Sequence, residues 1–149
     1  MDMGTLSSEH EIKKENYKNV MKNMIFNFLK FYKWYDSSFH FLKSEFVVGD
    51  YESKICGTID NLSVSKLTNK LSILDYKTNQ SIKKEGYNGK KLLNDLSHLD
   101  DCELTKYSLQ LHIYKHILEK NTNFEVDNMY IVWFPENKQY ELITPLSLD

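Results

Sequence analysis

Two carboxylates and one lysine are the residues of this chain whose types and spacing could do chemistry. Asp75 and Lys77 stand two positions apart in the apolar segment "LSILDYKT", and Asp60 ends the segment "GTID" upstream. Residues i and i+2 of a strand share a face, so Asp75 and Lys77 point the same way and Tyr76 points the other way. If a tight turn near residues 67–69 pairs the two segments, two of the three expected registers place Asp60 on that same face.

Such a cluster suits the hydrolysis of a phosphodiester. Carboxylate oxygens are the preferred ligands of Mg²⁺, which keeps several waters and also takes phosphate oxygens. The metal lowers the pKa of a bound water and neutralises charge on the phosphate. An ammonium group beside it orients the water or stabilises the pentavalent phosphorus. The simpler interpretation is a salt bridge on a solvated sheet face, which an isolated D-x-K pattern favours.

A glutamine and a tyrosine form a second candidate pair. In "YSLQLHIYKHIL", Gln110 and Tyr114 are spaced i, i+4 and share one face of an expected helix. A Gln within an otherwise apolar stripe needs a polar partner. The alternative interpretation is a core Tyr next to a half-exposed Gln.

The elements that must position these residues follow from hydrophobic periodicity. A capping box at Ser8 and Glu11 predicts a helix from about Ser8 to Tyr35. Three strands, a long loop with a short helix near residues 90–93, a second helix and a final hairpin follow. The strands are expected at residues 39–48, 52–65 and 71–78, and the loop at residues 79–106. The second helix is expected at residues 104–120 and the hairpin at residues 127–146. The order predicts a single mixed α/β domain over residues 1–149.

Composition excludes several classes of protein. Among 149 residues, 19 basic side chains face 21 acidic ones, for a net charge of -2, so there is no overall basic footprint for nucleic acid. Two distant cysteines, Cys56 and Cys102, cannot form a four-cysteine zinc or iron–sulfur site. We expect a reducing, cytoplasmic location, because no disulfide framework, secretory signal or membrane-spanning run is visible.

Taken together, "GTID", "LDYKT" and "YSLQLHIY" resemble the PD-(D/E)XK nuclease superfamily, and within it the RecB-like branch. That branch has a Glu on its first strand, then G-x-x-D, D-Y-K-T and Q-x-x-x-Y in this order. The first-strand acid falls on Glu45 in "FLKSEFVVG". The resemblance implies a restriction-endonuclease-like core, with a mixed sheet flanked by helices, and a Mg²⁺- or Mn²⁺-dependent deoxyribonuclease. Small nucleases of this kind are frequent in bacteriophages.

The resemblance also implies a set of metal ligands. Asp60 and Asp75 would bind the metal with the backbone carbonyl of Tyr76. Glu45 would be a further ligand or a base. RecB-like members often add a His from the first helix, shortly after a Gly-Thr pair. The candidate here is His10, which lies further from Gly4-Thr5 than the resemblance implies.

The remaining roles concern the water and the DNA. By the resemblance, Lys77 would position the attacking water, and Gln110 and Tyr114 would contact the DNA backbone or hold that lysine. In the long loop, a basic patch of Lys83, Lys84, Lys90 and Lys91 suits phosphate contacts, and Tyr87 within it suits stacking on a base. A solvated lysine-rich loop is the competing interpretation.

Several functions remain open at this point. An exonuclease for DNA recombination, repair or processing is favoured, and a structure-specific endonuclease is close behind. A catalytically silent DNA-binding or adaptor module with the same fold is the rival from another class. The expected partners are DNA, single- or double-stranded, and a helicase or recombination protein, since the chain has no helicase motif; no membrane partner is expected.

Overall fold

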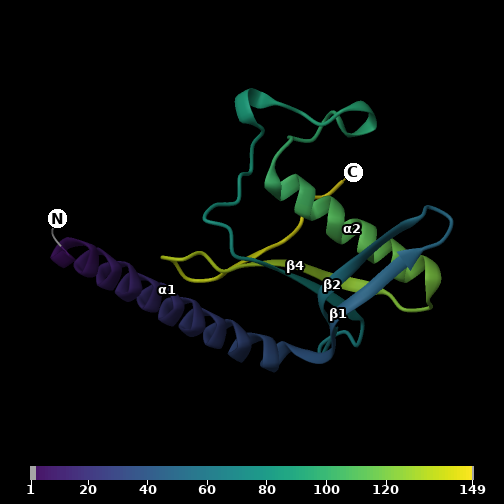
Figure 1. Cartoon of the computed structure of the whole chain (residues 1–149). Helices are drawn as coiled ribbons and strands as arrows, with labels where there is room; N and C mark the ends of the chain where they lie inside the picture. The colour runs from purple at the N-terminus through teal and green to yellow at the C-terminus, as the bar shows by residue number, and fades with distance from the viewer. Residues whose placement is uncertain (1–2, 149) are drawn as a thin grey trace.

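The protein is an α/β molecule with two helices and a five-stranded mixed sheet (Figure 1). The structure is a computed structural model that describes the backbone of residues 3–148 and the side chains of residues 8–148. The helices and strands are α1 (Met3–Ser38), β1 (Phe39–Asp50), β2 (Ile55–Ser65), β3 (Leu71–Lys77), α2 (Glu103–Asn121), β4 (Val126–Trp133) and β5 (Glu141–Ile143).

The strands lie in the sheet in the same order as in the chain. β1, β2 and β3 form an antiparallel meander, as the alternating apolar pattern predicts. β3 and β4 pair in parallel, and α2 makes the crossover that a parallel connection requires. β5 returns antiparallel to β4, which confirms the expected final hairpin.

The two faces of the sheet have separate cores, because successive residues of a strand point to opposite faces. α2 covers one face, where Leu111 packs against Ile73 and Ile131. The last turns of α1 cover the other face, where Phe31 packs with Leu74. Ile73 and Leu74 are neighbours on β3, so this strand is buried on both sides.

Only the C-terminal part of α1 packs against the sheet. From Asn27 onward, buried residues recur along the helix, and Asn27 Nδ2 donates to the carbonyl of Lys138 at 2.6 Å. Residues 8–19 are all exposed, and this half of α1 projects beyond the sheet (Figure 1). The prediction of a capping box at Ser8 and Glu11 is wrong, because the helix already runs from Met3 and Ser8 lies inside it.

The long loop between β3 and α2 has two short 3₁₀ turns, η1 (Tyr87–Gly89) and η2 (Asn94–Leu96). The expected short helix near residues 90–93 is therefore wrong. Lys91 instead forms an isolated β-bridge with Asp100, and backbone bonds such as Asp101 N to Lys90 O (2.9 Å) hold that extended stem. Neither described helix has an apolar stretch long enough to cross a bilayer.

Candidate active site

The candidate site lies at the edge of the sheet where β3 ends. The last β2–β3 partners are Asn61 and Leu74, so the next positions in register are Asp60 and Asp75. This is one of the two registers that place both carboxylates and Lys77 on one face. Because β3 and β4 are parallel, their carboxyl ends meet at this edge, and Phe134 N donates to Lys77 O at 2.8 Å.

The acid–acid–lysine group is in direct contact. Lys77 Nζ lies 2.7 Å from Asp75 Oδ2 in an ion pair. Asp60 Oδ2 accepts a hydrogen bond from the backbone N–H of Tyr76 at 2.8 Å. The structure thus brings together Asp60, Asp75 and Lys77 with the backbone of Tyr76, while the Tyr76 ring packs on the α1 face.

Asp75 is the most perturbed group of the site. Its residue is only 3 % exposed, and burial raises the pKa of its carboxyl. The neighbouring Lys77 opposes this effect, and the Asp60 carboxyl reinforces it. Although Asp75 Oδ2 is close to Lys77, no described donor makes a well-aligned hydrogen bond to it. A buried carboxylate oxygen with spare capacity is a suitable ligand for a hard cation.

A tyrosine that the sequence analysis did not single out holds the lysine. The Lys77 ammonium lies 4.5 Å from the centre of the Tyr107 ring, within range of a cation–π interaction. Tyr107 OH in turn accepts a hydrogen bond from Asn79 Nδ2 at 2.9 Å. The signal was present in the sequence, because Tyr107 stands three positions before Gln110 on the same helix face.

The glutamine and tyrosine of α2 bond to each other. Gln110 Nε2 donates to Tyr114 OH at 2.8 Å, which gives the Gln its polar partner. The Tyr114 ring lies directly over Gly57 of "GTID", where an added Cβ would stand 2.5 Å from Tyr114 Cε1. The glycine of this motif therefore admits the α2 tyrosine close to the backbone of β2.

A buried polar network supports the site from the α1 face. Asn61 Nδ2 donates to Tyr76 OH at 2.9 Å, and Tyr35 OH lies 2.6 Å from Ser63 Oγ. Ser63 Oγ also donates to Asn61 Oδ1, so the two bonds form one chain. The network links α1, β2 and β3, and it fixes the residue whose N–H binds Asp60.

Two of the predicted metal ligands are not assembled with the others. Glu45 is exposed and has a φ of 49°, which turns its side chain away from the regular alternation of β1. His10 is exposed in the projecting half of α1. Among the residues described, no three His, Cys, Asp or Glu side chains form a metal-sized cluster. The expected ligand set thus reduces to Asp60, Asp75 and the Tyr76 carbonyl.

The predicted basic patch is partly neutralised. Lys90 pairs with Asp101 at 2.7 Å, and Lys91 pairs with Asp100. These acids lie across the stem of the loop, so Lys90 and Lys91 are paired within the loop although both stay exposed. Lys83 and Lys84 are exposed as well, and Tyr87 is 80 % exposed.

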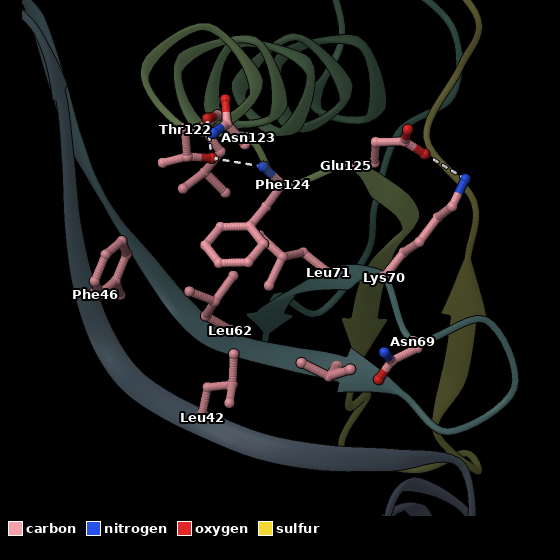
Figure 2. Close-up of a pocket in the computed structure, with 12 residues that line it drawn as sticks. Leu42, Phe46, Leu62, Asn69, Lys70, Leu71, Thr122, Asn123, Phe124 and Glu125 are labelled. Carbon is pink, nitrogen blue, oxygen red and sulfur yellow. Dashed lines mark hydrogen bonds and ion pairs between the residues drawn. The ribbon is translucent and has the colours of Figure 1, made fainter.

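An apolar groove lies away from this site. It has a volume of about 610 Å³, and Figure 2 shows the Phe124 ring pointing into it above Leu62. Lys70 and Glu125 form an ion pair at its rim. Lys70 precedes β3, whereas the carboxylates stand at the end of that strand, so the groove and the candidate site occupy opposite ends of the β2–β3 pair.

The chemistry that this arrangement can do rests on its donor set. Asp60 of β2 and Asp75 of β3 offer carboxylate oxygens from adjacent strands. The N–H and C=O of Tyr76 both point toward β2, on the side of Asp60. Two carboxylates and one carbonyl fit a Mg²⁺ or Mn²⁺ ion that keeps water or phosphate oxygens in its other positions. No protein-family model matches this chain, and no curated protein is significantly similar to it.

Proposed function

We propose that this chain is a Mg²⁺- or Mn²⁺-dependent DNA nuclease of the RecB-like PD-(D/E)XK type. The observation that carries the proposal is the contact group of Asp60, Asp75 and Lys77 at the carboxyl edge of β3, with Lys77 Nζ 2.7 Å from Asp75 Oδ2. The order of the elements, a helix, a three-stranded meander and a crossover helix to a parallel strand, is compatible with a restriction-endonuclease-like core.

Asp60, Asp75 and the Tyr76 carbonyl would hold the metal. When bound, the ion would lower the pKa of a coordinated water and neutralise negative charge on the scissile phosphate. The Asp75 carboxyl must lose its proton to bind a cation, and because burial raises its pKa, protons compete with the metal at a higher pH than they would at an exposed aspartate.

Lys77 would act on the water and the phosphate. Its ammonium already faces Asp75, and the Tyr107 ring limits where it can move. A point charge held in this way can orient a nucleophile or stabilise charge on phosphorus without reorganising. Gln110 and Tyr114 bond to each other and lie over β2 through Gly57, so we assign them the role of supporting this edge and contacting the DNA backbone.

The exposed loop residues would contact the rest of the substrate. Lys83 and Lys84 remain available for phosphates, and Tyr87 for stacking on an unpaired base. Lys90 and Lys91 are assigned a smaller part, because a contact with phosphate would first have to break their ion pairs with Asp101 and Asp100.

A cleavage assay tests the proposal. Linear duplex, single-stranded and closed circular DNA are incubated with Mg²⁺ or Mn²⁺, with wild type and Lys77→Ala in parallel. Lys115→Ala, a half-exposed lysine of α2, is the matched control. We expect metal-dependent cleavage that Lys77→Ala loses and Lys115→Ala keeps. Cleavage of the circle would assign an endonuclease, and cleavage of linear DNA alone an exonuclease.

A binding measurement separates an inactive enzyme from a silent module. Mg²⁺ or Mn²⁺ should raise the melting temperature of wild type but not that of Asp75→Asn. Metal stabilisation without cleavage would point to an enzyme that needs a helicase or recombination partner. Neither stabilisation nor cleavage would overturn the nuclease proposal in favour of the silent DNA-binding module.

A further inference from the structure

The exposed side of α1 carries an uncovered apolar stripe that runs from the projecting half into the half that packs on the sheet. Its members lie on one helix face at spacings of three, four or one residue, and each is between 46 % and 71 % exposed. We call the following set the α1 stripe: Tyr17, Met21, Ile25, Phe28, Leu29 and Tyr32. It runs beside the residues that face the sheet, such as Phe31 and Tyr35, on the neighbouring face of the helix.

The projecting segment has little else to stabilise it as a helix. Lys18 and Glu15 form an ion pair at 3.7 Å, but both side chains are more than half exposed and such pairs contribute little. Helices owe most of their stability to the burial of an apolar face. A helix that extends past its own sheet with this stripe uncovered therefore needs a second surface.

The exposed area of the whole chain leads to the same conclusion. The solvent-accessible surface is 10548 Å². A compact monomer of this mass is expected to expose about 7900 Å², so the excess is roughly 2600 Å². A stable protein–protein interface buries about 800 Å² on each partner. The excess is larger than one such interface, and the exposed residues of the α1 stripe contribute to it.

We propose that the α1 stripe is covered by the α1 stripe of a second copy of this chain, with the two helices antiparallel. When the stripes are centred on each other, Tyr17 of one copy faces Tyr32 of the other, and Met21 faces Phe28. Large apolar side chains then meet along the entire stripe. Each sheet packs on the C-terminal half of its own α1, so the antiparallel pair places the two sheets toward opposite ends.

The charges beside the stripe select a second copy as the occupant. Glu15 and Lys33 are five helical turns apart, so both lie on the same flank of the stripe. In the centred antiparallel pair, Glu15 of each copy comes opposite Lys33 of the other. In a parallel pair this flank would instead face the opposite flank of the other copy, so Glu15 and Lys33 would not meet. The flank thus complements its own reversed copy, with two ion pairs related by the dimer axis.

Sedimentation of the full chain tests the assembly. We expect wild type to be a dimer at micromolar concentration, and Ile25→Glu to raise the dissociation constant at least about tenfold, because the isoleucine side chain is buried in the pair. Ile12→Glu is the matched control, since Ile12 is exposed on the same helix but lies off the stripe. A monomeric wild type, or equal weakening by both variants, would overturn the proposal.

Cross-linking tests the orientation independently of any nuclease activity. In a Cys56→Ser background, Tyr17→Cys chains are mixed with Tyr32→Cys chains under mild oxidation. The antiparallel pair predicts mixed disulfides, whereas two copies of residue 17 would stand about 22 Å apart. Disulfides between identical chains would overturn the antiparallel arrangement.

Charge reversal tests the ion pairs beside the stripe. Glu15→Lys should weaken the dimer, and adding Lys33→Glu should restore it. If the double variant stayed weak, the pairing of Glu15 with Lys33 of the other copy would be refuted.

Discussion

The contact between Gly57 and Tyr114 gives a sharp prediction about the packing of α2 on β2. A methyl group added at position 57 would stand 2.5 Å from Tyr114 Cε1, 2.6 Å from its OH and 2.9 Å from its Cζ. Distances this short force the tyrosine to move, and its hydroxyl then loses the 2.8 Å bond from Gln110. Gly57→Ala should therefore destabilise the fold, although alanine is normally the better residue in a strand.

The expected magnitude follows from three contributions. Overpacking in a well-packed region costs about 1–3 kcal/mol. Losing the Gln110–Tyr114 hydrogen bond costs about 1 kcal/mol. Replacing glycine by alanine in a strand returns about 0.5–1 kcal/mol through the lower entropy of the unfolded chain. The net loss is about 1–3 kcal/mol, which lowers the urea midpoint by roughly 0.5–1.5 M for a protein of this size.

Urea denaturation followed by circular dichroism measures this change. Gly49→Ala is the matched control, because a Cβ there would meet only Cys56 Cβ at 3.6 Å and Ile55 O at 3.8 Å, which are ordinary contacts. In a Tyr114→Leu background the clash is absent, so Gly57→Ala should become neutral or stabilising. If Gly57→Ala were as stable as Gly49→Ala, the close approach of Tyr114 to β2 would be refuted.

Three further predictions concern the site and its support. Because burial raises the pKa of Asp75, the folded state binds that proton more tightly than the unfolded state. This contribution is present at low pH and is lost as pH rises through the raised pKa. With a chelator present, Asp75→Asn should therefore gain stability relative to wild type as pH rises. Thermal melts from pH 4 to 8 measure this, and a constant difference in melting temperature between the two proteins would contradict it. Lys77→Met should raise the Asp75 pKa further, which an NMR titration of that carboxyl reads directly; a lowered pKa would exclude the ion pair. Tyr35→Phe should cost about 1–2 kcal/mol in urea, since it leaves Ser63 with one partner fewer in a buried network, and an unchanged midpoint would count against that network.

Local patterns were sufficient to predict the central part of the molecule. The two-residue period of a strand fixes which residues of "LSILDYK" share a face, so the prediction that Asp75 and Lys77 lie on one side followed from the sequence. The short connection between β2 and β3 limited the register to a few values, and the observed one pairs Asn61 with Leu74. The 3.6-residue period of α2 likewise placed Gln110 and Tyr114 together.

Features set by irregular backbone or distant partners could not be predicted. The register of β1 shifts between Phe41 and Lys43, and the positive φ of Glu45 follows shortly after; neither has a sequence signal here. The pairing of Lys90 and Lys91 with Asp101 and Asp100 depends on how the loop closes. The start of α1 escaped prediction because its helical pattern extends upstream of a plausible cap.

The sequence of β2 and β3 also bears on the order in which the site forms. Asp60, Asp75 and Lys77 lie within one antiparallel pair joined by a short turn, so their contacts close only a small loop of chain. Gln110 and Tyr114 lie more than thirty residues beyond the end of β3, and the parallel pairing of β4 closes a connection of some fifty residues. Non-local pairings of this kind are slow to form. We therefore expect the two carboxylates to come together early in folding and α2 to dock later, over an edge of the sheet where both carboxylates already lie.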